Sequence, residues 1–564
     1  MENKNLIIAI AVSCVIFLGW NFLSVQMGWI PAEPVQQNAT VAQPAPDASP
    51  ASPAAASTLA NDVAMGTTEA TAPVRADMAV QVKTPLYEAT FMRQGGILTR
   101  LELMQFRKNL RADSPQVSLV SEYAATRGPF SLIVNGMPSW KTTEWTLEGG
   151  DLQLSAGQKG TLVFSGEIDG VRVNRIMTFH GDRYTIDEKT VLASDKSRVV
   201  NVAYTFAATQ LSIQDSPSFF SRLSYHFFGG EEPKPSESQY NITRVAWLEN
   251  GKFSEEMDKA DLREGVLLKN KVSWVAVMNN YFMGAVSMAD ASGIGKAGAA
   301  GDAFVALIGK TGLTVEPQQQ TTTECTYFIG PKEARVLAQA PNDIERALDY
   351  GFFSIIAKPL VLLLGFLHDY VGNWGIAIIL MTIIIKIVFW PLSQKSYKSM
   401  NGLKKIQPLM AELREKYKDD KEMLNKEMMA LYKRHKVNPA GGCLPILVQI
   451  PVFFGLYQAL LNAIELRHAT FISYLPFTDL PWLQDLAAAD PFLITPLVMG
   501  ATMFLQQKMT PAPGDPTQAK MMMFMPFIFT ILFLGFPAGL VLYWLTNNVI
   551  SIGQQWWQLR SADK

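Results

Sequence analysis

The chain has 564 residues, of which 48% are hydrophobic and 18% are charged, and its formal net charge is −1. Charged residues fall below the roughly 25% typical of soluble domains, and the mean hydropathy of +0.10 indicates a membrane protein. The near-zero net charge argues against a general nucleic-acid binder.

The first 30 residues predict a membrane anchor that is retained in the mature protein. A polar head with Lys4 precedes an apolar run from Leu6 to Val25. This run has about 20 residues, whereas a cleaved signal peptide has an apolar core of about 7 to 15. Cys14 loosely suggests a lipoprotein cleavage site, but the apolar sequence continues well past it. We expect a transmembrane anchor over residues 1–30 and, over 31–80, a disordered linker rich in Pro and Ala.

Residues 81–345 predict a large all-β, sandwich-like domain. Runs such as TLVFSGEIDGVRVNRIMTF alternate apolar and polar residues and are separated by turn residues, which is the pattern of short antiparallel strands. Cys325 is the one cysteine in this stretch, so an internal disulfide is excluded. The segment IGKTG ends like a phosphate-binding loop, but Phe304 stands where that motif needs glycine. The scattered histidines form no hydrolase or zinc-protease signature, so we expect neither an enzyme nor a cofactor or metal.

From residue 346 onward the sequence predicts a helical membrane part. An amphipathic stretch over 346–370 is expected to lie along the membrane interface. With the anchor, the apolar segments predict six transmembrane helices, five of which form the membrane core. These five spans are 371–391, 443–464, 491–507, 521–537 and 538–557.

The charges of the connecting segments predict the orientation. Residues 392–442 carry twelve Lys or Arg, whereas 465–490 carry one Arg and four acidic residues. By the positive-inside rule the first segment is cytoplasmic and the second lies on the outer side. The loop 508–520 and the tail 558–564 are then cytoplasmic, as are both termini. The β domain falls on the outer side, which is the periplasm if the membrane is a bacterial inner membrane.

The basic segment 392–442 predicts a cytoplasmic hairpin of two helices. Apolar residues including Ile406 and Met410 repeat at helical spacing, and Asp419 and Asp420 offer a turn and a cap before a second repeat. One interpretation is an orientation signal with a solvated face. The other is docking on an anionic partner, because twelve basic and six acidic residues leave a net charge of +6. The cations chosen as docking candidates are Lys395, Lys398, Lys404, Lys405, Arg414, Lys433 and Arg434.

Lys386 stands inside the apolar run GIAIILMTIIIKIVFWP. It lies roughly 7 Å from the predicted cytoplasmic end at 1.5 Å per residue, so one interpretation is a lysine that extends to the headgroups. The other is a polar cleft, because Thr382 lies one turn away and other spans carry Gln449 and Asn547. The spans of the helical part offer no acidic countercharge, so Lys386 in a cleft would attract a negatively charged guest.

Two long segments carry a family resemblance. NPAGGCLPILVQIPVFFGLYQAL (Asn438–Leu460) and MMMFMPFIFTILFLGFPAGLVLYWLTNN (Met521–Asn548), with the six-span layout, the basic hairpin and the outer β domain, resemble the YidC membrane-protein insertases of Gram-negative bacteria. The resemblance extends over essentially the whole chain. It implies insertion of newly synthesised proteins into the inner membrane, alone or with the Sec translocon, without nucleotide hydrolysis. It also implies a hydrophilic groove that is open to the cytoplasm and the lipid.

The resemblance implies roles for individual residues. The cationic groove residue of the family falls on Lys386, where many members carry arginine. Thr382, Gln449 and Tyr543 match groove-facing positions, and Trp544 stands where a second tyrosine is often found.

The resemblance also implies partners. The hairpin matches the region that meets ribosomes and guests, and the β domain resembles a supersandwich-type domain implicated in contacts with the Sec translocon and its accessory subunits. The implied partners are nascent membrane proteins, the Sec translocon, the ribosome and membrane lipid, without a small-molecule substrate.

Two other functions stay open. A secondary transporter would also carry polar groups in its spans, although such transporters commonly show repeated halves, and no internal repeat is present. A scaffold or assembly factor that holds Sec components through its β domain would depend on residues 83–340 and tolerate changes at Lys386.

Overall fold

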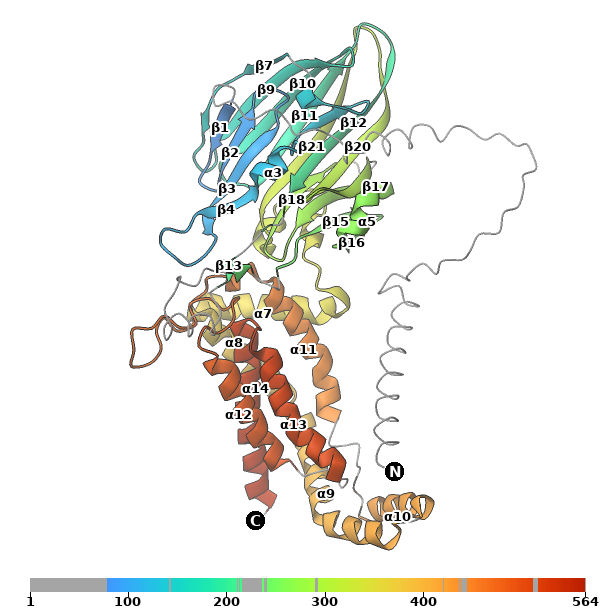
Figure 1. Ribbon diagram of the computed structural model, residues 1–564, viewed down its shortest axis with the longest axis vertical. Helices are drawn as coiled ribbons and strands as arrows, with labels where there is room; N and C mark the ends of the chain where they lie inside the picture. Colours follow the sequence, from blue (N-terminus) through green and yellow to red (C-terminus); the bar gives the residue numbers. More distant parts are fainter. Residues whose placement is uncertain are drawn as a thin grey trace, which may run out of the picture. The chain divides into compact units, whose positions relative to one another are not determined.

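In the computed structural model, a largely antiparallel β domain precedes a set of helices in the sequence (Figure 1). The structure describes residues 79–562 except 142–143, 210, 212–213, 216–235, 238–240, 290–292, 419, 436, 438–443 and 511–515. The predicted anchor, 1–30, and nearly all of the predicted linker, 31–80, lie outside the described residues.

The β domain contains a five-stranded sheet and a 14-stranded sheet. The smaller sheet has the order β4-β3-β2-β1-β8, and its strands are β1 (Ala79–Lys83), β2 (Tyr87–Met92), β3 (Leu98–Arg107), β4 (Gln116–Val120) and β8 (Leu152–Gln153). The larger sheet has the order β6-β5-β12-β20-β19-β17-β18-β21-β11-β10-β9-β7, with β15 and β16 beside β17. Its strands are β5 (Leu132–Val134), β6 (Met137–Pro138), β7 (Trp145–Glu148), β9 (Lys159–Ile168), β10 (Val171–His180), β11 (Thr185–Ala193), β12 (Arg198–Ala208), β15 (Arg244–Glu249), β16 (Lys252–Glu256), β17 (Val266–Met278), β18 (Phe282–Ser287), β19 (Gly293–Ala300), β20 (Ala303–Val315) and β21 (Gln320–Pro331).

Short elements complete the domain. They are a strand pair, β13 (Gln214–Asp215) and β14 (Ser236–Glu237), and three helices, α3 (Glu122–Ala125), α5 (Lys259–Glu264) and α6 (Ala334–Leu337).

The predicted strand alternation is visible in the hairpin of β9 and β10. Asp169 and Gly170 connect the two strands with φ angles of 51° and 69°, and an Asp-Gly pair with positive φ is typical of a tight β-hairpin turn. Residues of β10 are alternately buried and more exposed, so one face of the strand enters the core. The core joins residues of both sheets. The IGKTG segment lies inside strand β20 rather than in a phosphate-binding loop.

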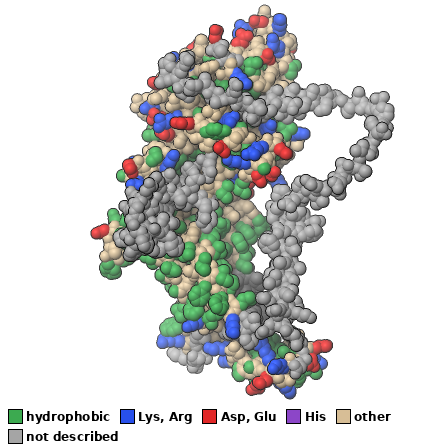
Figure 2. Space-filling model, viewed as in Figure 1, with side chains coloured by type: hydrophobic (Ala, Val, Ile, Leu, Met, Phe, Trp, Pro, Cys, Tyr) green, Lys and Arg blue, Asp and Glu red, His purple; other side chains and the backbone are tan. Residues whose placement is uncertain are grey.

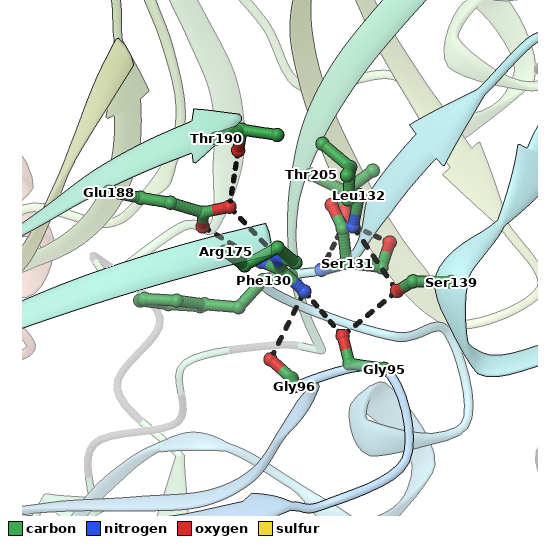
Figure 3. Close-up of polar contacts among 10 residues, drawn as sticks. All are labelled: Gly95, Gly96, Phe130, Ser131, Leu132, Ser139, Arg175, Glu188, Thr190 and Thr205. Carbon is green, nitrogen blue, oxygen red and sulfur yellow. Dashed lines mark hydrogen bonds and ion pairs between the residues drawn. The ribbon is translucent and has the colours of Figure 1, made fainter. Parts of the chain in front are cut away.

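Arg175 on β10 and Glu188 on β11 form an ion pair inside the β domain (Figure 3). Both side chains are fully buried, and Nε and Nη2 of Arg175 donate to the two carboxylate oxygens of Glu188 at 2.8 Å each. Arg175 also donates to the carbonyl oxygens of Gly95 and Phe130. Burial disfavours the charge of the guanidinium, but the attraction and hydrogen bonds of Glu188 hold the pKa of Arg175 above its ordinary value. The pair fixes two strands to the turn between β2 and β3.

The helical part begins after short helical turns near residue 350. Its helices are α7 (Ser354–Val371), α8 (Trp374–Val388), α9 (Trp390–Lys416), α10 (Lys421–Arg434), α11 (Leu444–Asn462), α12 (Ile494–Met509), α13 (Pro516–Phe533) and α14 (Ala538–Ala562). Among the described residues, one helical segment, Gly351–Val371, is long and apolar enough to cross a membrane. The pair α8 and α9 also meets this criterion if the two helices are counted as one span, although they are bent by 64° relative to each other. The apolar helix Lys520–Phe533 is shorter.

The helices pack around an apolar core and expose apolar side chains outward. Ile378 and Met381 of α8 are fully buried against residues such as Leu456 and Val541. On α13, by contrast, residues such as Ile531 are largely exposed. Figure 2 shows hydrophobic side chains gathered over these helices and Lys and Arg side chains at the end that carries α9 and α10. An apolar outer surface is the expected surface of a membrane domain, because lipid replaces water there.

Helices α9 and α10 form the predicted hairpin. Ile406, Met410 and Leu431 bury a small core between them. The side chain of Asp420 accepts a hydrogen bond of 3.0 Å from the backbone N–H of Met423, so the predicted helix cap is confirmed at this residue.

Candidate functional site

Lys386 lies in the last turn of α8 and is 8% exposed. Its Nζ donates a hydrogen bond of 2.7 Å to Oγ of Ser551 on α14. No ion pair joins Lys386 to a carboxylate within the described part of the chain. A buried ammonium with a neutral hydroxyl partner is not neutralised, so it is suited to receive an anionic group.

Ser551 is itself held by its neighbours. Its hydroxyl donates to the carbonyl oxygen of Asn547 at 2.7 Å, and the hydroxyl of Tyr397 on α9 lies 3.4 Å from the Ser551 carbonyl oxygen. Gln449 on α11 donates from Nε2 to Oδ1 of Asn547 at 2.8 Å. The predicted residues Lys386 and Gln449 are therefore linked to the same face of α14.

A small cavity lies beside these groups. It is lined by Ile385, Lys386, Phe389, Leu392, Ser393 and Gln449. Its walls combine one cation, one amide and one hydroxyl with the apolar side chains of Ile385, Phe389 and Leu392, so it can hold a small polar group next to Lys386.

The other three predicted site residues lie on α8 and α14. Thr382 is fully buried, and its hydroxyl donates to the carbonyl oxygen of Ile378 at 2.7 Å within α8. Tyr543 is 1% exposed. The indole of Trp544 packs edge-to-face on Phe453, with ring centres 4.7 Å apart, and is part of an aromatic cluster.

The predicted docking cations follow the hairpin. Lys395, Lys398, Lys404, Lys405, Lys433 and Arg434 are exposed, and Arg414 is half-buried. They stand on α9 and α10 around the apolar core of the hairpin, so the basic surface belongs to a folded element.

Comparison with known proteins gives full-length matches. Residues 366–564 match the family described as "60Kd inner membrane protein", and residues 79–363 match the "YidC periplasmic domain". The chain is 51% identical to "Membrane protein insertase YidC" of Nitratidesulfovibrio vulgaris strain Miyazaki F, over 100% of both chains. The chain belongs to the YidC family. A protein of the same name from Lawsonia intracellularis is 47% identical, again over 100% of both chains.

The YidC family membership confirms the resemblance read from the sequence. It also confirms a large periplasmic β domain, a helical domain of an inner membrane protein and a function that is not enzymatic. A solved structure described as "Active YidC insertase crystal structure with the first transmembrane domain resolved" is similar at 19% identity, with a TM-score of 0.35, and covers 87% of this chain and 94% of that chain.

Sequence reasoning on this YidC chain missed Ser551 and Tyr397. Ser551 follows Asn547 by one helical turn in an apolar segment, and this spacing was a signal for a shared polar face. Tyr397 gave no such signal, because its place beside α14 depends on the bend between α8 and α9. Among the described residues no group of three or more His, Cys, Asp and Glu side chains is arranged to hold a metal ion.

Proposed function

We propose that the chain inserts newly synthesised proteins into the inner membrane by holding a polar or acidic segment of the guest beside Lys386. The observation that carries this proposal is the buried ammonium of Lys386, which is bonded to Ser551 and to no carboxylate among the described residues. A guest carboxylate in the adjoining cavity would supply the missing countercharge. Hydrogen bonds to charged groups contribute about 1.5–3 kcal/mol, which is enough to delay a passing segment without trapping it.

The apolar segment of the guest supplies the driving force. Transfer of about 20 apolar residues from water to lipid is favourable at roughly 25 cal/mol per Å² of buried apolar area. The polar segment is the obstacle, because an unpaired polar group in hydrocarbon costs several kcal/mol. A polar cleft that begins within the membrane shortens the distance that the polar segment of the guest must cross through hydrocarbon. The process then requires no nucleotide.

The proposed arrangement in the membrane has six spans with both termini in the cytoplasm. The five spans of the helical part correspond to α8, α11, α12, α13 and α14, and α7 lies along the periplasmic interface. In support, Ile355 and Leu362 of α7 are 83% and 72% exposed while Ala357 and Leu364 are buried, which gives α7 one apolar outer side. The basic hairpin on the cytoplasmic side agrees with the positive-inside rule.

The proposed partners are nascent membrane proteins, the ribosome and the Sec translocon with its accessory subunits. The exposed cations of α9 and α10 support a contact with ribosomal RNA, because clustered lysines and arginines bind phosphates without sequence specificity. The β domain is proposed to contact Sec proteins, as the family resemblance implies.

Reconstitution tests this function directly. The purified chain in liposomes is expected to protect a small newly made membrane protein with an acidic tail from protease, without nucleotide or other proteins. Lys358, an exposed lysine on α7, provides a matched control. Lys386→Ala should lower insertion and Lys358→Ala should not. If the chain is folded but inserts the guest no better than protein-free liposomes do, the result would instead favour an assembly factor that works only with Sec proteins.

A further inference from the structure

Three glutamines near the end of α14 are buried without complete hydrogen bonding. Gln554, Gln555 and Gln558 are 3%, 4% and 8% exposed. Nε2 of Gln554, Oε1 of Gln555 and Nε2 of Gln558 have no hydrogen-bond partner among the residues that the structure describes. Buried amides in folded proteins normally find partners, so three neighbouring exceptions need an explanation.

Packing does not explain these side chains. A leucine has nearly the same size as a glutamine and leaves no buried polar atom unpaired, so it would be the more favourable residue in a purely structural role. Neighbouring residues that lower the stability of the folded protein are typical of sites that bind a partner.

The glutamines continue the polar face that carries the partner of Lys386. At 100° per residue, Asn547, Ser551, Gln554, Gln555 and Gln558 fall within an arc of roughly 80 to 100° on α14. The rise from Ser551 to Gln558 is about 10 Å at 1.5 Å per residue. The polar face therefore extends from the partner of Lys386 toward the C-terminal end of the helix.

The three unpaired side-chain atoms indicate which class of ligand would bind here. The two Nε2 atoms are donors and the Oε1 atom is an acceptor, and none of them is charged. Neutral donors and acceptors in a row match an extended polypeptide backbone, which presents C=O and N–H groups alternately. Such contacts do not depend on the side chains of the ligand, so they suit a protein that handles guests of different sequence.

We propose that Gln554, Gln555 and Gln558 form a binding site for the backbone of an extended guest segment, and this site follows Ser551, the partner of Lys386, along α14. The inference rests on the proposed function, because it assumes that the guest enters the cleft. Lys386 selects charge in the guest, whereas the glutamines hold its main chain. The guest opens the closed packing around the glutamines and supplies the hydrogen bonds that they lack.

The first test separates binding from stability. The variant with all three glutamines changed to leucine is compared with Gln394→Leu, which alters an exposed glutamine on α9. The triple variant should unfold at the same temperature as the wild-type chain or higher, and should insert a one-span synthetic guest about fivefold more slowly, as expected for one or two lost hydrogen bonds. An unchanged insertion rate, or a slower rate together with a lower unfolding temperature, would overturn the proposal.

The second test identifies the backbone as the ligand. Guests are synthesised with one backbone N–H at a time replaced by an ester oxygen along the polar tail. At one or more positions this change should slow insertion by the wild-type chain about threefold but have little further effect on Gln555→Leu, which has lost the acceptor. Equal losses in both chains at every position would overturn backbone recognition and would leave a lipid headgroup as the candidate ligand.

Lys386→Ala measured in parallel distinguishes the two proposals. If the glutamine variants insert slowly and Lys386→Ala inserts normally, the charge role of Lys386 is refuted and the backbone site is supported. If the glutamine variants insert normally and Lys386→Ala inserts slowly, only the backbone site is refuted.

Discussion

Arg175→Met is expected to destabilise the β domain by about 3–5 kcal/mol, because it leaves Glu188 as a buried charge without its partner. Two hydrogen bonds of 2.8 Å to the carboxylate are lost, and the carbonyl oxygens of Gly95 and Phe130 lose their donor. At about 2–4 °C per kcal/mol for a domain of this size, the unfolding temperature should fall by roughly 6–20 °C. Calorimetry of the purified full chain measures this shift.

Arg172 provides the matched control on the same strand. Its side chain pairs with Asp195 at 2.7 Å, but the two side chains are 62% and 88% exposed. Arg172→Met should therefore cost less than about 1 kcal/mol. Adding Glu188→Leu to Arg175→Met should recover part of the loss, since no buried charge then remains. Equal effects of Arg175→Met and Arg172→Met would refute the reasoning.

Three further predictions concern single residues. Ser551→Ala should destabilise the helical part by about 1–3 kcal/mol in thermal unfolding and Ser551→Thr should not, because Lys386 loses its hydrogen-bond acceptor only in the first variant. Burial lowers the pKa of Lys332 from 10.5 to about 7. The unfolded chain therefore binds more protons at this residue between pH 7 and about 10, so stability should rise over that range, and the rise should shrink in Lys332→Met when unfolding is followed against pH. Asp420→Ala should weaken the hairpin by about 1 kcal/mol, measured as faster hydrogen exchange at the start of α10, whereas Asp420→Asn should be nearly neutral.

Local patterns predicted much of the fold. The alternation around Asp169 and Gly170 is the hairpin of β9 and β10, and the apolar repeats of the basic segment are the two helices joined before Asp420. The Arg175–Glu188 pair was not predicted, although a signal existed: Val173, Arg175 and Met177 occupy one face of an alternating strand, so a charge stands at a core position.

The site was predicted less completely than the fold. Lys386 was noticed because a charge in an apolar run is conspicuous in any sequence, and the structure buries its side chain. Its partner Ser551 lies 165 residues later, and their contact depends on how α8 and α14 pack. Trp544 stands where the family often has a second tyrosine, and the sequence did not show that its ring packs against Phe453. Side-chain direction on a packed helix depends on tertiary contacts, which spacing along the chain does not specify.

The most direct test of the central claim is a charge exchange between Lys386 and the guest. Lys386→Arg should insert a guest with an acidic tail normally, whereas Lys386→Glu should insert it poorly because like charges repel. Changing the acidic residues of the guest tail to lysine should restore insertion by Lys386→Glu and impair insertion by the wild-type chain. If Lys386→Glu inserts both guests as well as the wild-type chain does, the charge of Lys386 has no role in receiving the guest.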